Sequence, residues 1–173
     1  MLEGRPYHVP EEEHVTPFVL ERRQFLPVPP EAAFRFFDRP ENLAEITPAE
    51  LGFRILTPSP IAMKEGALID YTIRVLGIPV RWTTMITSYD PPRGFVDQQL
   101  RGPYSYWHHT HAFRAVDGGT EMTDTVRYLL PFGPLGNLLH ALAVRRQLER
   151  IFEHRSRVIA GRFPGPAEKG GTR

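Results

Sequence analysis

The chain has 173 residues, of which 41% are apolar, and a formal net charge of +1. This length and composition are typical of one globular domain with a sizeable core. No apolar run approaches the roughly 18 residues that span a membrane, and a net charge near zero lacks the basic excess of nucleic-acid-binding proteins. Because there is no cysteine, disulfides, thiol nucleophiles and thiolate metal sites are excluded. The amino-terminal stretch has no basic-then-apolar signal pattern, so we expect a cytoplasmic location.

The pattern of prolines and glycines divides the chain into three parts. We expect a flexible arm over residues 1–17, a single domain over residues 18–163, and a flexible tail over residues 164–173. Neither the composition nor the pattern indicates an oligomeric state.

The domain begins with one strand and two short helices. β-Favouring residues from Phe18 to Leu26 predict a strand that ends at a proline cluster. Phe34 and Phe37 share one helical face, which predicts a short helix over residues 31–37. A second short helix is predicted over residues 41–46, before Pro48.

From Gly52 onward the apolar period changes to two, which indicates strands. Phe53 and Ile55 predict a short strand. Two longer strands follow, with inward residues at alternate positions: Tyr71, Ile73 and Val75 on one, and Val80, Trp82, Thr84 and Ile86 on the other. A two-residue turn at Gly77 and Ile78 would pair Val75 with Val80.

The strand over residues 95–100 has no clear inner face. Phe95, Asp97 and Gln99 alternate with Val96, Gln98 and Leu100, and each set mixes apolar and polar residues. The pattern therefore leaves open whether Asp97 points inward.

A second hairpin is better determined by the sequence. One strand places Trp107, His109, His111 and Phe113 on a single face, and the next places Met122, Asp124, Val126 and Tyr128 on another. A turn at Asp117 and Gly118 would pair Phe113 with Met122 and His111 with Asp124. A turn at Gly118 and Gly119 would shift this register by one pair.

The chain ends in a long amphipathic pattern from Pro134 to Phe163. At 3.6 residues per turn its apolar residues share one side, namely Ala141, Val144, Leu148, Ile151, Phe152, Val158 and Ile159. This predicts one helix of about 40 Å. Tight turns make neighbouring strands antiparallel, so the fold class is α+β: a curved sheet of about seven strands wrapped around this helix, with two short helices after the first strand.

Three stretches of this sequence resemble the START-like, or SRPBCC, superfamily. They are the run from Pro29 to Leu43, the Trp107-x-His109-x-His111-x-Phe113 strand, and the stretch from Gly119 to Asp124, the last two being similar to its polyketide cyclase/dehydrase and coenzyme Q-binding branch. The resemblance covers residues 18–163. It implies the helix-grip fold and a deep apolar cavity between sheet and helix for a hydrophobic molecule. It transfers no single catalytic motif.

Polar residues on inward faces are the candidate functional groups. A buried carboxylate needs a partner, and the register offers His111 to Asp124. Such a pair could orient a ligand or move a proton, or it could be a structural polar patch. Arg155 falls inside the apolar helix stripe, so we expect it to pair with a carboxylate such as Asp124 or to meet a ligand.

The His109-x-His111 pair also raises the question of a metal. A metal site needs a third ligand, for which only Asp97 or Asp124 is available, and with that incomplete set we expect no metal and no cofactor. Aromatic residues on inward faces are ordinarily core, and core is the safer interpretation for most of them; a binding pocket is the alternative, which the polar residues that interrupt these faces support. The expected ligand-binding residues are Tyr71, Ile73, Trp82, Thr84, Ile86, Trp107, His109, His111, Asp124, Tyr128, Leu148, Phe152 and Arg155.

Three functions fit these features. The leading hypothesis is binding, transport or sequestration of a small hydrophobic ligand such as a lipid, a quinone or a polyketide-like aromatic. The second is an enzyme of the cyclase, dehydratase or hydrolase type with His111 and Asp124 as acid and base; the lack of a nucleophile motif favours binding over catalysis. The third is an interaction module like the chaperone activators, with side chains filling the cavity.

Overall fold

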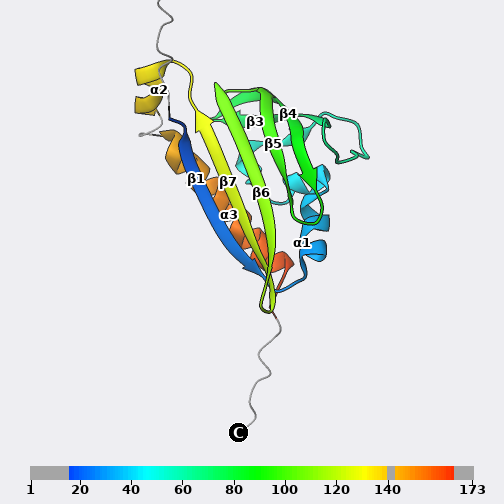
Figure 1. The fold of residues 1–173 in the computed structure, drawn as a ribbon. Helices are drawn as coiled ribbons and strands as arrows, with labels where there is room; N and C mark the ends of the chain where they lie inside the picture. The colour runs from blue at the N-terminus through cyan, green and yellow to red at the C-terminus, as the bar shows by residue number, and fades with distance from the viewer. Residues whose placement is uncertain (1–15, 140–142, 166–173) are drawn as a thin grey trace, which may run out of the picture.

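A curved antiparallel sheet and one long helix form the framework of the molecule (Figure 1). The computed structural model describes residues 16–139 and 143–165. The strands have the order β1-β7-β6-β5-β4-β3-β2 in a single sheet. Their bounds are β1 Phe18–Leu26, β2 Arg54–Ile55, β3 Leu68–Val75, β4 Ile78–Asp90, β5 Gly94–Arg101, β6 Tyr106–Val116 and β7 Gly119–Leu129.

Short helices follow the first strand. Helix α1, Pro30–Phe37, starts with a proline in its first turn and buries its phenylalanine face. The ring of Phe34 lies 5.7 Å from that of Phe113 on β6. The second predicted helix, over residues 41–46, is instead a single 3-10 turn, η1 Pro40–Ala44, followed by η2 Ala49–Leu51.

The carboxy-terminal helical region differs from the single helix predicted over residues 134–163. The structure has α2, Gly133–Leu139, and α3, Arg145–Arg162, and residues 140–142, with Ala141, lie outside the described part. Figure 1 shows α3 running along one face of the sheet while α2 lies apart from it beside β1. Leu135 and Leu138 of α2 are exposed, so these two leucines do not extend the buried stripe.

The predicted stripe of α3 is buried as expected. Val144, Leu148, Phe152 and Ile159 are each at most 4% exposed, and Ile151 and Val158 are half-buried. Arg155 lies in this stripe and is 7% exposed. The helix therefore carries one cation into the interface with the sheet.

The register of the β6–β7 hairpin is the predicted one. Phe113 pairs with Met122, His111 with Asp124, His109 with Val126 and Trp107 with Tyr128, around a turn at Asp117 and Gly118. The two strands alternate in and out in phase, and an aspartate-glycine turn fixes their offset.

The β3–β4 register is shifted by two residues from the prediction. Val75 pairs with Ile78, Ile73 with Val80 and Tyr71 with Trp82. The turn lies at Leu76 and Gly77, whose φ angles of 51° and 82° are both positive, as a type I′ turn requires. A leucine with positive φ is uncommon, and a shift of two keeps the same faces inward, so the apolar pattern alone could not reveal it.

Two apolar clusters form the core beneath the sheet. One gathers around Phe34, Phe113, Met122 and Ile159, and the other around Trp82, Trp107, Val126 and Phe152. Between them on β6 and β7 lie His109, His111 and Asp124, each no more than 6% exposed. The core is thus divided by a polar cluster.

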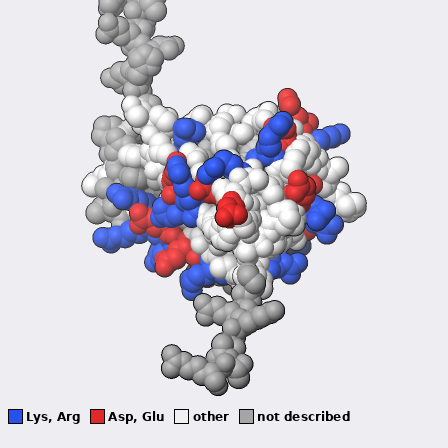
Figure 2. All heavy atoms as spheres, turned by 60° about the horizontal axis from the view of Figure 1, so that its bottom comes forward, with Lys and Arg blue, Asp and Glu red and all other residues white. Residues whose placement is uncertain are grey.

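Charges of both signs are interspersed on the outer surface in the view of Figure 2. Several form ion pairs, such as Arg114 with Glu121 at 2.8 Å and Arg93 with Asp90 at 2.7 Å. None of the described helices is long and apolar enough to cross a membrane.

Candidate functional site

The strand β5 places Asp97 inward, which settles the question that its sequence left open. Phe95 is buried, and Leu100, of the other face, is 54% exposed. The pairing of β5 with β6 sets Asp97 directly opposite His109. Sequence reasoning did not include Asp97 among the expected site residues; the signal available was that two inward histidines on a neighbouring strand need polar partners.

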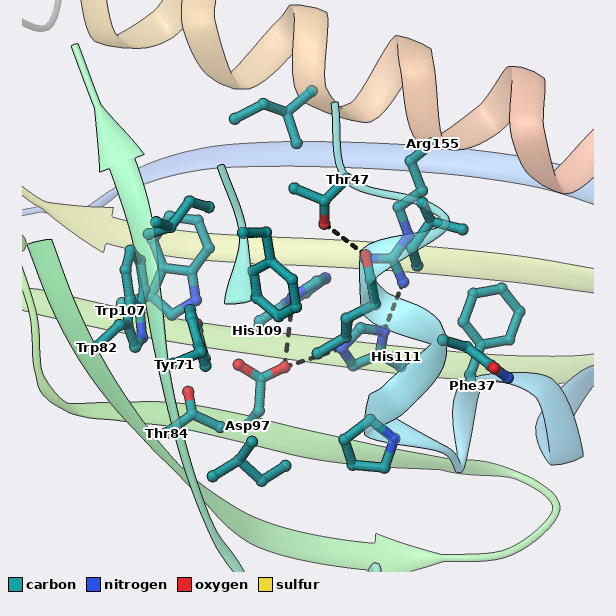
Figure 3. Close-up of a pocket in the computed structure, with 18 of the residues that line it drawn as sticks. Phe37, Thr47, Tyr71, Trp82, Thr84, Asp97, Trp107, His109, His111 and Arg155 are labelled. Atoms are coloured by element: carbon teal, nitrogen blue, oxygen red, sulfur yellow. Dashed lines mark hydrogen bonds and ion pairs between the residues drawn. The ribbon is translucent and has the colours of Figure 1, made fainter. Parts of the chain in front are cut away.

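Four polar side chains, Asp97, His109, His111 and Asp124, surround each other at this position, and Figure 3 shows the first three of them. Asp97 Oδ2 lies 2.9 Å from His111 Nε2 and 3.4 Å from His109 Nδ1. On the other side of the two rings, Asp124 Oδ1 lies 3.1 Å from His109 Nε2 and 2.9 Å from His111 Nδ1. The histidines are therefore held between two carboxylates.

Arg155 completes this polar cluster from α3. Its Nη2 atom lies 3.5 Å from Asp124 Oδ1 and 3.4 Å from His111 Nδ1. Figure 3 shows Arg155 reaching from the helix toward the histidines, with Asp97 on their opposite side. The predicted pairings of Asp124 with His111 and with Arg155 are both present, and His109 shares the same carboxylate.

The cluster shifts the pKa values of its own members. Burial opposes ionisation of Asp124, but Arg155 and both histidines outweigh it, so the pKa of Asp124 lies well below its usual value. Burial likewise opposes ionisation of Asp97, and the histidines lower its pKa in spite of that. Both carboxylates are therefore negatively charged at neutral pH.

The two histidines respond in opposite directions. Burial and the charge of His111 lower the pKa of His109. Burial also disfavours charge on His111, but hydrogen bonding to Asp124 and Asp97 outweighs it and raises the pKa of His111. The two imidazole rings have centroids 3.8 Å apart, so two positive charges there would repel each other strongly. The site therefore favours one imidazolium, at His111.

A pocket of about 170 Å³ lies between the sheet and α3 and contacts this cluster. Asp97, His109, His111 and Arg155 line part of it, and the rest of its wall is mainly aromatic and aliphatic. Eleven of the thirteen expected residues line the pocket: Tyr71, Ile73, Trp82, Thr84, Ile86, Trp107, His109, His111, Leu148, Phe152 and Arg155.

The other two expected residues lie behind the wall. Asp124 contacts the rear side of the histidines, and Tyr128 packs in the second apolar cluster, with its ring 6.0 Å from that of Trp107. The sequence did not point to several wall residues, among them Phe37, Phe53, Met63, Phe95, Asp97 and Tyr104. Most of these come from loops, α1 or β5, where no clear alternation marked an inner face.

Two buried N–H groups in the pocket wall have no hydrogen-bond partner within the described residues. They are the indole Nε1 of Trp82 and the Nε of Arg155. Buried donors of this kind are usually satisfied, so an unpaired one in a pocket wall calls for an acceptor from elsewhere. An oxygen-bearing ligand would supply it.

A curved antiparallel sheet closed by a carboxy-terminal helix over one pocket is the helix-grip fold. The chain belongs to the polyketide cyclase/dehydrase and lipid transport family, whose model matches residues 26–155. No match is found among curated proteins.

Solved structures share the fold at low sequence identity. TTHA0849 from Thermus thermophilus is 17% identical, covers 83% of this chain and 98% of its own, and has a TM-score of 0.59. CV1439 from Chromobacterium violaceum is 12% identical, covers 86% of this chain and 98% of its own, and has a TM-score of 0.65. Ara h 8.0201 is 17% identical, with coverages of 83% and 98% and a TM-score of 0.54.

Proposed function

We propose that this protein binds a small aromatic or quinone-like molecule that carries a polar oxygen, in the pocket between the sheet and α3. The observation that carries the proposal is the asymmetry of the wall. Aromatic and aliphatic side chains cover most of it, while the cluster of Asp97, His109, His111 and Arg155 is concentrated at one place. Apolar walls supply affinity, and a few placed polar groups fix orientation.

The size of the pocket narrows the ligand class. An apolar cavity of about 150 Å³ accommodates benzene, whereas drug-sized ligands occupy about 300–1,000 Å³. At about 170 Å³ the pocket suits a compact molecule of one or two rings. Of the lipid, quinone and polyketide-like aromatic ligands considered from the sequence, a long-chain lipid fits this volume least well.

The aromatic residues favour a flat ligand. Tyr71 and Trp82 are stacked with ring centroids 5.8 Å apart, and Trp107 meets Trp82 edge-on at 5.2 Å. Figure 3 shows these three side chains together at one side of the pocket, with the histidines beside them. A ring lying against these aromatics would bring its hydroxyl or carbonyl oxygen within reach of the unpaired Trp82 Nε1.

The experiment compares 2-naphthol, naphthalene and palmitate by calorimetry and by tryptophan fluorescence. The chain has only two tryptophans, Trp82 and Trp107, and both line the pocket, so a bound ring should change their emission. We expect 2-naphthol to bind about fivefold more tightly than naphthalene, since it alone can form a hydrogen bond of about 1 kcal/mol. Palmitate should bind more weakly than 2-naphthol.

A matched pair of substitutions tests whether the probes bind in the pocket. Ile73→Trp fills the pocket and should abolish binding, whereas Ile78→Trp adds the same side chain at a position that is 65% exposed and should leave it unchanged. Equal binding by the two variants, or no heat and no change in emission with any of the three probes, would refute the proposal.

Acid/base catalysis on a bound ligand is the second candidate function. One observation favours it: His111 lines the pocket and ion pairs with Asp97 and Asp124, which raise its pKa although burial opposes this. If a bound compound is converted, for example by cyclisation or dehydration, His111→Gln should abolish turnover while binding persists. Unchanged turnover would remove His111 from the mechanism. The pocket volume gives the interaction-module hypothesis, with its filled cavity, less support.

A further inference from the structure

One carboxylate and two imidazoles converge on a single point of the pocket wall. The ligand atoms of Asp97, His109 and His111 all lie within 4.8 Å of one another. They come from adjacent paired strands, with His109 and His111 two residues apart on one face of β6 and Asp97 opposite His109 on β5. We propose that these three side chains form a binding site for a divalent transition metal of the Zn²⁺ type. The sequence alone predicted no metal, because it left the direction of Asp97 open.

The spacing of the three side chains suits such an ion. Bonds of about 2.05 Å in a tetrahedral zinc site place neighbouring ligand atoms about 3.3 Å apart. Asp97 Oδ2 lies 3.4 Å from His109 Nδ1 and 2.9 Å from His111 Nε2. These two distances are within about 0.4 Å of that spacing, and the ligand atoms of the two histidines lie within 4.8 Å of each other, so small side-chain rotations would bring all three to bonding positions. All three residues line the pocket, so a fourth position is open toward a ligand.

The groups behind the histidines match the usual surroundings of metal-bound imidazoles. A metal-bound histidine generally donates its other ring N–H to a carboxylate, which fixes the tautomer. Asp124 Oδ1 lies 3.1 Å from His109 Nε2 and 2.9 Å from His111 Nδ1, the two nitrogens that do not face Asp97. Asp124 does not line the pocket, so it is placed to orient the rings rather than to meet a ligand.

A count of donors supports the same assignment. Four ring nitrogens of His109 and His111 each face a carboxylate oxygen at 2.9–3.4 Å. With His109 neutral and His111 an imidazolium, the two rings offer three N–H donors, so one of these four contacts would join acceptor to acceptor. A cation beside Asp97 would bind the ring nitrogens on that side and leave one N–H of each histidine for Asp124.

The test uses the full-length protein, freed of metal by dialysis against a chelator, and ZnCl₂ alone. We expect one equivalent to bind with a dissociation constant of about 1 µM or lower, measured by calorimetry and by competition with a fluorescent chelator. Asp97→Asn and His109→Gln should each weaken binding at least about 100-fold, because removal of even an outer-shell partner costs about 10- to 100-fold. MgCl₂ should not compete, since Mg²⁺ prefers all-oxygen sites.

Matched controls locate the site. Asp90→Asn makes the same change at an exposed aspartate, and His108→Gln makes it at the neighbouring histidine of β6, which is not part of the cluster. Both should retain wild-type affinity. Zinc binding that survives Asp97→Asn and His109→Gln, or no binding at about 100 µM ZnCl₂, overturns the proposal.

A spectroscopic measurement on the unmodified chain keeps the test open if a variant does not fold. Co²⁺ in place of zinc should give visible absorption bands typical of four or five ligands. It should also shift the ring-proton NMR signals of His109 and His111 much further than those of His108, because only ligands that bind the metal show large contact shifts. Absence of both effects counts against the site. Since the metal is the only probe, the result does not depend on the proposed binding of an aromatic ligand.

Discussion

Replacing the buried carboxylate Asp124 by asparagine tests the physical account of the polar cluster most directly. Asp124 Oδ1 meets His109 at 3.1 Å, His111 at 2.9 Å and Arg155 at 3.5 Å, and Asp124 and Arg155 are both at most 7% exposed. Removing one member of a buried ion pair costs about 3–5 kcal/mol because the partner charge stays buried. Asparagine keeps one acceptor oxygen, so we expect the lower end, about 3 kcal/mol, and a Tm lower by about 6–12 °C.

The assay is urea unfolding followed by tryptophan fluorescence, with Glu121→Gln as the matched control. Glu121 is also a β7 carboxylate paired with an arginine, at 2.8 Å from Arg114, but that pair lies at the surface. Its loss should shift Tm by no more than about 2 °C. If the free energy of unfolding of Asp124→Asn lies within about 1 kcal/mol of the wild-type value at pH 7, the cluster does not hold a buried cation as described.

The same variant tests how the stability of the fold depends on pH, and the direction of the effect can be predicted. The pKa of Asp124 lies well below its usual value of 3.8 in the folded chain. Its stabilising contribution is therefore fully present above about pH 5 and is lost as the pH falls through the lowered folded-state pKa. The difference in unfolding free energy between the wild type and Asp124→Asn should shrink as the pH is lowered from about 5 toward about 3. A difference that grows over this range would contradict the assignment.

Two further predictions concern the pKa values of the histidines and the space around two glycines. In the metal-free protein, NMR titration should place the pKa of His111 above 6.5 and that of His109 below it, and the reverse order would contradict the hydrogen-bond assignment. A Cβ at Gly94 would meet the backbone carbonyl of His111, so Gly94→Ala should lower stability by about 1–3 kcal/mol. Gly161→Ala, with open space in α3, should instead raise it by about 0.5–1 kcal/mol, and urea unfolding compares the two.

The sequence predicted the part of the fold in which independent patterns agree. On β6 and β7 two inward faces alternate in phase, and the observed register is the one with the turn at Asp117 and Gly118. A turn at Gly118 and Gly119 would also have matched the faces, so the sequence left that one alternative open. The β3–β4 hairpin has equally clear faces, but its turn uses Leu76 in a conformation that leucine seldom adopts. A shift of two residues leaves every face unchanged, so periodicity fixed the faces and not the offset.

The candidate site was predictable up to the point where strands had to be paired. His109, His111, Asp124 and Arg155 each interrupt an apolar face, and this interruption is visible in the sequence. Asp97 gave no such indication, because both faces of β5 mix apolar and polar residues. Its inward position depends on how β5 pairs with β6. This contact between separate strands cannot be deduced from the sequence pattern of β5 alone.

The local sequence pattern also could not show whether the terminal helix is continuous. Leu135 and Leu138 have the spacing of a buried helical face, yet both are exposed on α2, while the same spacing from Val144 to Ile159 is buried on α3. Helical periodicity shows which residues share a side of a helix. It does not show whether a sheet is present to cover that side.

We infer from the energetics of the polar cluster that it serves the binding proposed for the pocket rather than the stability of the fold. Apolar clusters lie on both sides of it along β6 and β7, with Phe113 and Met122 on one side and Trp107 and Val126 on the other. Well-packed apolar residues in place of buried ion pairs are often as stable or more stable, so a continuous core would have met the needs of folding. The cluster instead sets the carboxylate of Asp97, two imidazoles and a guanidinium against a cavity between the sheet and α3, with Asp124 behind the histidines. Under the proposed functions, their desolvation is the cost of holding polar groups in fixed orientations before a ligand or an ion arrives.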